Sequence, residues 1–173
     1  MEFGSLTDWI SSLSTFFTLV VAWKAYKAAP QWIKEKQNEE GFNHIKTLMS
    51  EYDEIVSTII RLHSEILTIK RNDKQYNILA DKIKYETYRI FDLNAKLKSC
   101  ARWNIKYPNE VNNAFNRLTE YYDQSLLVLT FSGISVPEQA DSLTDNLNII
   151  KNQIENDVSF FDKSIQKIFT FPR

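Results

Sequence analysis

The feature that most constrains the fold is a run of apolar residues spaced alternately three and four positions apart. The run continues without a break for about seven helical turns, and its members are Ile45, Leu48, Tyr52, Ile55, Ile59, Leu62, Ile66 and Ile69. Residues at this spacing share one side of an α-helix and form the seam along which helices pack at a shallow angle. The sequence therefore predicts a long helix that packs within a bundle.

Three more apolar stripes with helical spacing follow along the chain. The second comprises Tyr76, Leu79, Ile83, Ile90, Leu93, Leu97 and Cys100; the third comprises Val111, Phe115, Leu118, Tyr122, Ser125 and Leu129; the fourth comprises Leu143, Leu147, Ile150, Ile154, Val158, Phe161, Ile165 and Ile168. Three Gly and four Pro in 173 residues leave few tight turns for a many-stranded sheet. Short connections make successive helices antiparallel neighbours, so we predict that residues 42–173 form an antiparallel four-helix bundle.

An uncharged run of 15 residues, Trp9–Trp23, precedes this bundle. Fifteen helical residues cover roughly 22 Å, which is less than the ~30 Å hydrocarbon core of a bilayer. Lys24 and Lys27 have long stems that can reach lipid head groups, and with their help the run extends to Ala29 and about 31 Å. We therefore predict an all-α chain with one transmembrane helix at residues 6–36. The alternative is a helix buried in a soluble bundle.

Side chains typical of membrane interfaces flank the uncharged run: Trp9, Trp23, Lys24, Tyr26, Lys27 and Trp32. The lysines follow the run, whereas its amino-terminal side carries Asp8 and no Lys or Arg. The positive-inside rule then predicts a single-pass protein with its N-terminus outside and its C-terminal bundle in the cytoplasm.

Three segments mark expected boundaries. Met1–Ser5 looks like a leader left by cloning and is set aside. Pro30 is expected to end or kink the first helix, because proline lacks the N–H group that the helix needs. Asn38–Gly41 is expected to form a joint before the bundle.

Small and hydroxyl-bearing residues share one side of the uncharged run: Ser11, Ser14, Thr15, Thr18 and Ala22. At 100° per residue they fall within an arc of roughly 100°. Small residues let helix backbones approach closely, and they can also border a water-filled lumen. These five are therefore candidate pore or helix–helix contact residues. The alternative is that the hydroxyls bond to the carbonyl groups four residues earlier.

The sequence offers little material for catalysis or for a cofactor. One Cys and two His leave little for a metal site, and no Gly-rich phosphate loop or metalloprotease motif is present in the sequence. The net charge of -1 argues against direct nucleic-acid binding. His63 lies among apolar residues, and His44 follows Glu40 by one turn, a spacing common to many surface pairs. We therefore expect neither an enzyme nor a bound cofactor.

One segment is a partial match to a nuclease motif. Helical ribonuclease bundles of the HEPN type use an Arg followed a few residues later by a His. Here Arg102 is followed by Tyr107 in the place of that His. Without an imidazole the general acid–base role is unfilled, so the segment is a degenerate HEPN-like echo.

The whole layout resembles the small membrane accessory protein of type VI-B CRISPR systems. The resemblance rests on size, on the apolar helix Trp9–Trp23 with Lys24 and Lys27 behind it, on the helical body and on the echo at Arg102–Tyr107. It implies a homo-oligomeric pore in the bacterial inner membrane that assists an RNA-guided RNase in antiviral defence. Its partners would be copies of itself, the lipid bilayer and that nuclease. The competing hypothesis is an interaction module without a pore, membrane-tethered or soluble, that docks a partner protein.

Overall fold

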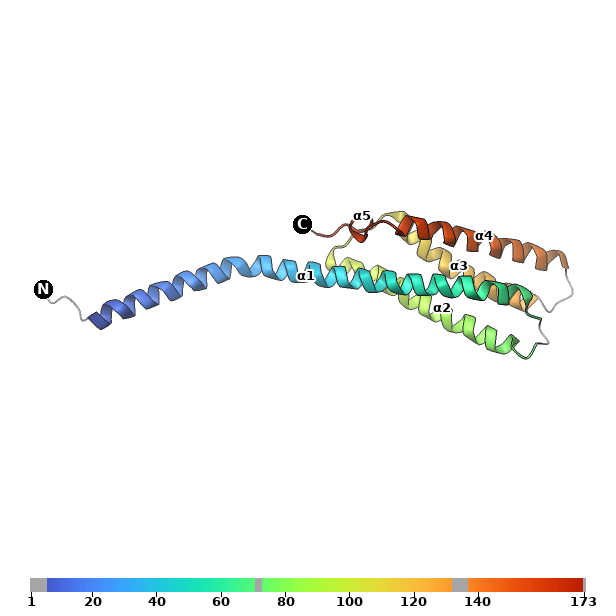
Figure 1. Cartoon of the computed structure of the whole chain (residues 1–173), viewed down its shortest axis with the longest axis horizontal. Helices are drawn as coiled ribbons and strands as arrows, with labels where there is room; N and C mark the ends of the chain where they lie inside the picture. Colours follow the sequence, from blue (N-terminus) through green and yellow to red (C-terminus); the bar gives the residue numbers. More distant parts are fainter. Residues whose placement is uncertain (1–5, 71–72, 132–136, 173) are drawn as a thin grey trace. The chain divides into compact units, whose positions relative to one another are not determined.

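The structure, a computed structural model, describes residues 6–70, 73–131 and 137–172. In these residues the order of helices is α1 (Leu6–Thr68), α2 (Tyr76–Ser99), η1 (Cys100–Trp103), α3 (Asn109–Phe131), α4 (Pro137–Phe161) and α5 (Ile165–Ile168) (Figure 1). One isolated antiparallel bridge pairs Lys106 with Thr170. Met1–Ser5, predicted to be a cloning leader, lies outside the described residues.

The chain divides into two compact units, with the boundary between Glu40 and Gly41. Helix α1 belongs to both units, because it begins at Leu6 and ends at Thr68. The first unit contains the part of α1 before Gly41. The second unit contains the remainder of α1 and all the other helices.

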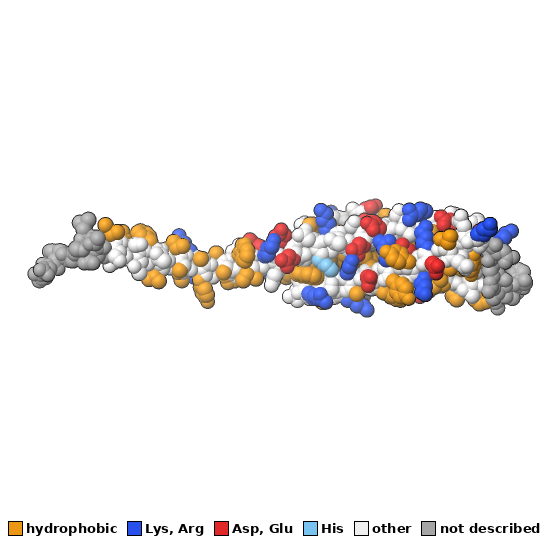
Figure 2. Space-filling view, turned by 90° about the horizontal axis from the view of Figure 1, so that it is seen from below, with side chains coloured by type: hydrophobic (Ala, Val, Ile, Leu, Met, Phe, Trp, Pro, Cys, Tyr) orange, Lys and Arg blue, Asp and Glu red, His pale blue; other side chains and the backbone are white. Residues whose placement is uncertain are grey.

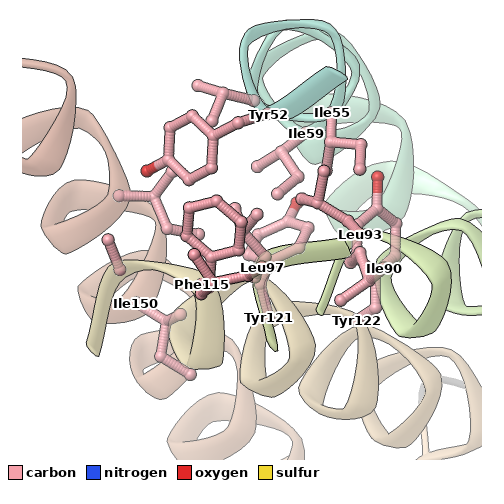
Figure 3. Close-up of a cluster of buried hydrophobic side chains, with 14 of the residues drawn as sticks. Tyr52, Ile55, Ile59, Ile90, Leu93, Leu97, Phe115, Tyr121, Tyr122 and Ile150 are labelled. Atoms are coloured by element: carbon pink, nitrogen blue, oxygen red, sulfur yellow. The ribbon is translucent and has the colours of Figure 1, made fainter. Parts of the chain in front are cut away.

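The second unit is a bundle of α1, α2, α3 and α4, with α3 packed against both α2 and α4. The first seam is fully buried from Ile45 to Ile66, and the second is buried from Leu79 to Cys100. In the middle of the bundle the ring of Tyr52 stacks on Phe115 with centroids 5.1 Å apart. Figure 3 shows these rings among aliphatic side chains contributed by all four helices. Burial of these seams is the main stabilising contribution to the bundle.

Two ion-pair clusters replace apolar contacts at the edge of this core. Glu86 interrupts the second seam and is buried, and its carboxylate accepts a hydrogen bond from Arg89 at 3.0 Å. Arg89 also pairs with Glu54 of α1 at 3.1 Å. Between α3 and α4, the Nε atom of Arg117 donates to Oδ2 of Asp157 at 2.6 Å. A charge is tolerated at these depths because each is paired and hydrogen-bonded.

Helix α1 continues through both segments at which an interruption was expected. Pro30 lies inside the helix, and residues 38–41 are helical, so neither feature ends α1. Proline removes one hydrogen bond to the carbonyl group of Tyr26, and the helix continues beyond that local loss. Helix α4 instead ends earlier than its stripe predicts, at Phe161, and Val158 of that stripe is exposed.

The predicted transmembrane helix is also wrong. Within the described residues, no helix contains a stretch that is both long enough and apolar enough to cross a bilayer. The uncharged run is 15 residues long, and any extension takes in Lys24 and Lys27, while Ser and Thr lower its hydropathy. The predictions of a membrane protein, a pore and a single-pass inner-membrane location with the N-terminus outside are withdrawn with it.

Candidate functional site

The amino-terminal part of α1 exposes a continuous series of large apolar side chains. Ten of them leave between 57% and 79% of their surface exposed: Trp9, Ile10, Leu13, Phe16, Phe17, Leu19, Val21, Trp23, Tyr26 and Trp32. Figure 2 shows this segment in orange, with few charged atoms along it. Contiguous apolar surface of this extent is rare on proteins that act alone. We define the segment Trp9–Trp32 as the apolar arm.

The apolar arm lacks the charged face of an ordinary surface helix. At 100° per residue, the large apolar side chains from Trp9 to Trp23 cover about 200° of the circumference, and the small residues cover about 100°. No residue from Trp9 to Trp23 is charged. A helix of this kind is normally covered by protein or lipid, so the arm has the character of a binding element.

The small-residue stripe makes its hydrogen bonds within the helix. The Oγ1 atom of Thr15 donates to the carbonyl of Ser11 at 2.9 Å, and that of Thr18 donates to the carbonyl of Ser14 at 2.9 Å. A shallow groove on this side is lined by Ser14, Phe17, Thr18, Val21 and Ala22. Because both threonine hydroxyls are already bonded, this side of the arm can be covered without leaving their donors unsatisfied. Both bonds run from a hydroxyl to the carbonyl group four residues earlier, as the alternative interpretation of these residues predicts.

The flanking aromatic and basic residues contact their neighbours along the helix. The Nζ atom of Lys27 lies 4.0 Å above the ring of Trp23, which is a cation–π contact. Further along, Lys36 donates to Glu39 at 2.8 Å, and this bond raises the pKa of Lys36. Lys24 and Tyr26 are exposed. The arm therefore begins with an apolar stretch, and its second part contains the exposed lysines Lys24 and Lys27.

The HEPN-like echo extends from η1 into the connection between η1 and α3. Arg102 is exposed in η1, whereas Tyr107 is half-buried with its ring 6.0 Å from that of Phe169. Burial raises the pKa of the Tyr107 hydroxyl. The structure also brings His44 to this segment, which the sequence did not indicate, and its ring stacks on Trp103 at 4.5 Å. No local signal could have shown this contact, because the two residues are far apart in the chain.

Both histidines are engaged in contacts that hold helices together. The Nε2 atom of His44 lies 2.9 Å from the carbonyl of Lys96 and 3.1 Å from Oγ of Ser99. The Nδ1 atom of His63 lies 3.1 Å from the hydroxyl of Tyr121, and its Nε2 atom donates to Oδ1 of Asn148 at 2.9 Å. Both nitrogens of His63 are thus occupied, which leaves neither ready to exchange a proton with a substrate.

The remaining chemistry-bearing groups are equally enclosed. Cys100 is buried, and desolvation raises the pKa of its thiol to about 11, so the thiolate nucleophile is scarce at neutral pH. In the parts of the chain that the structure describes, no three His, Cys, Asp or Glu side chains lie close enough to share a metal ion. The apolar arm is therefore the surface with the clearest capacity for function.

Comparisons with known proteins add no assignment. No family model, no curated protein and no solved structure matches this chain. The candidate site is thus defined by the exposure and the contacts of its own residues.

Proposed function

We propose that this protein is a non-enzymatic interaction module. The bundle of Gly41–Arg173 is the scaffold, and the apolar arm is the element that docks against apolar helices of a partner protein. The single observation that carries this proposal is the exposure of the ten large apolar side chains of the arm. An enzyme has less support, because both imidazoles are occupied by contacts between helices.

The energetics of burial favour docking. An aromatic side chain can bury about 150–250 Å², so covering one side of the arm removes on the order of 500 Å² of apolar surface from water. At roughly 25 cal/mol per Å² this corresponds to about 12 kcal/mol before the entropic cost of association is subtracted. A partner with a matching apolar surface can therefore bind with useful affinity. The resemblance noted above makes an RNA-guided RNase the first named candidate to test.

The test compares two variants with equally exposed substitutions. Phe17→Glu/Val21→Glu places two charges on the arm, whereas Tyr85→Glu/Tyr88→Glu places two on the outer side of α2, where the tyrosines are 63% and 58% exposed. Proximity labelling in the source cells identifies candidate partners, and each purified candidate is then titrated with the wild-type chain and both variants. We expect the arm variant to bind at least tenfold more weakly and the α2 variant to bind like wild type. Equal binding by all three would contradict the proposal.

A second comparison tests for catalysis. His44→Ala and His63→Gln are expected to preserve partner binding and any cellular phenotype of the chain, provided that circular dichroism shows them to be folded. Loss of the phenotype with partner binding intact would favour an enzyme instead.

A further inference from the structure

A shallow groove between α1 and α4 is a second apolar surface, and it lies within the bundle. It is lined by Asp53, Val56, Ser57, Ile60, Arg61, Val158 and Asp162. Two of its aliphatic side chains, Ile60 and Val158, are 48% and 36% exposed. We call this surface the α1/α4 groove.

Two carboxylates mark one end of the α1/α4 groove. Asp53 and Asp162 both line the groove, and desolvation together with the charge of Asp162 raises the pKa of Asp53. Within the described residues neither carboxylate forms an ion pair. The groove thus has an apolar stretch that begins beside two negative charges, and the positively charged Arg61 lines it next to Ile60. A ligand that suits it carries positive charge next to apolar side chains.

The apolar arm carries this arrangement on one face. At 100° per residue, an arc of roughly 100° contains Leu13, Phe16, Val20, Trp23, Lys24 and Lys27. Lys24 lies about 12 Å along the helix from Phe16, and Asp53 lies about 10 Å along α1 from Ile60. Within the described residues neither Lys24 nor Lys27 is in an ion pair. The lysines of this face are opposite in charge to Asp53 and Asp162, and its apolar side chains lie at a similar spacing from them as Ile60 does from Asp53.

We propose that the arm of one copy docks in the α1/α4 groove of a second copy. Phe16 and Val20 contact Ile60 and Val158, while Lys24 and Lys27 pair with Asp53 and Asp162. This proposal rests on the proposed function, because it uses the arm as a docking element, and it adds a second copy that is bound through a different face of the arm. Exposed ion pairs add little affinity, so the apolar contact holds the copies together and the charges set the register.

The contact joins two different surfaces, so it leaves a free arm at one end and a free groove at the other. Such heterologous contacts produce rings or longer assemblies. The average mass should therefore rise above that of a dimer as the protein concentration increases. High salt should raise the protein concentration that association requires, because it screens the lysine–aspartate pairs.

Charge reversal tests the proposed pairing. Lys24→Asp/Lys27→Asp and Asp53→Lys/Asp162→Lys are each expected to weaken association of the full chain at least tenfold in sedimentation velocity. Mixing the two variants should restore it to within about threefold of wild type, because each arm then meets a groove of opposite charge. Lys46→Asp/Lys98→Asp, at two exposed positions of the bundle, is the control and should associate like wild type. Circular dichroism confirms that every variant is folded.

Several results would overturn this inference. They are a monomeric wild-type chain at every concentration, unchanged association in both reversed variants, and a mixture that fails to recover. Phe17→Glu/Val21→Glu separates this inference from the proposed function, because those residues lie outside the face that enters the groove. Suppose that charge reversal leaves self-association unchanged while Phe17→Glu/Val21→Glu still loses binding to the partner protein. The docking role of the arm then stands, and the α1/α4 groove is excluded as the surface that the arm binds.

Discussion

Gly41 lies directly against Ile105, so that a Cβ atom added to the glycine would be 2.9 Å from Cδ1 of Ile105. The same atom would be 3.2 Å from Cβ of Trp103. The glycine is therefore retained within a helix, where it ordinarily costs stability, because the connection after η1 packs on it. This close approach fixes the position of the segment that carries Arg102 and Tyr107.

Gly41→Val is expected to lower the free energy of unfolding by about 2 kcal/mol, because the new side chain overlaps Trp103 and Ile105. Urea denaturation followed by circular dichroism measures the change. Ser50→Val is the control, since Ser50 is exposed on the same helix, and it should change stability by less than about 0.5 kcal/mol. A Gly41→Val protein as stable as wild type would show that the contact is not tight in solution.

The ion pair between Arg117 and Asp157 is expected to contribute substantially to the packing of α3 on α4. The side chains are 25% and 15% exposed, so Asp157→Asn leaves a partly desolvated guanidinium without its counter-charge. We expect a loss of about 2 kcal/mol, less than the ~3–5 kcal/mol typical of fully buried pairs. Glu155→Gln removes the more exposed pair with Lys151 and should cost less than about 0.5 kcal/mol. Similar losses of stability in Asp157→Asn and Glu155→Gln would contradict the larger contribution expected of the Arg117–Asp157 pair.

Two buried tyrosines are expected to respond oppositely to loss of the hydroxyl group. Within the described residues the Tyr52 hydroxyl has no hydrogen-bond partner, whereas the Tyr121 hydroxyl bonds to Nδ1 of His63 at 3.1 Å. Tyr52→Phe should leave stability unchanged or raise it by up to about 1 kcal/mol, and Tyr121→Phe should lower it by about 1 kcal/mol. Thermal and urea denaturation check both values. A marked loss in Tyr52→Phe would reveal a bond that forms in solution.

Asp53→Asn is expected to stabilise the bundle slightly near pH 7 by removing a desolvated charge beside Asp162. The pKa of Asp53 is raised in the folded state, so folding favours the protonated form. The destabilising contribution of its charge is therefore present at neutral pH and is lost as the pH falls through the raised pKa. The difference in melting temperature between the variant and wild type should shrink from pH 7 to pH 4. A constant difference would mean that titration of Asp53 is not its cause.

Much of the bundle could be predicted from apolar spacing. All the members of the first seam from Ile45 to Ile66 are buried, as are all six of the third stripe. Burial of an uninterrupted stripe has few alternatives, because one side of a helix must be covered. The fourth stripe was less reliable at its end, where Val158 is exposed and α4 gives way to α5.

Contacts between distant segments could not be predicted. The pair of Arg89 with Glu86 has the local spacing of three residues, but nothing near Glu86 in the sequence shows that Arg89 also pairs with Glu54. The stacking of His44 on Trp103 depends in the same way on the meeting of two helices. The continuation of α1 through Pro30 was missed because a local rule for proline was given more weight than the helix on both sides. The membrane assignment failed because a short uncharged run was extended over two lysines.

The uninterrupted course of α1 through Gly41 links the formation of the arm to that of the bundle. An isolated peptide must first order several residues for one hydrogen bond, and this unfavourable nucleation limits short helices in water. In this protein the turns after Gly41 are held by buried seams, so the arm can grow residue by residue from a helix that already exists. Destabilising the bundle should therefore also unfold the arm. The fraction of chains with a helical arm would then depend on the stability of the bundle core, although a partner bound to the arm makes no contact with that core.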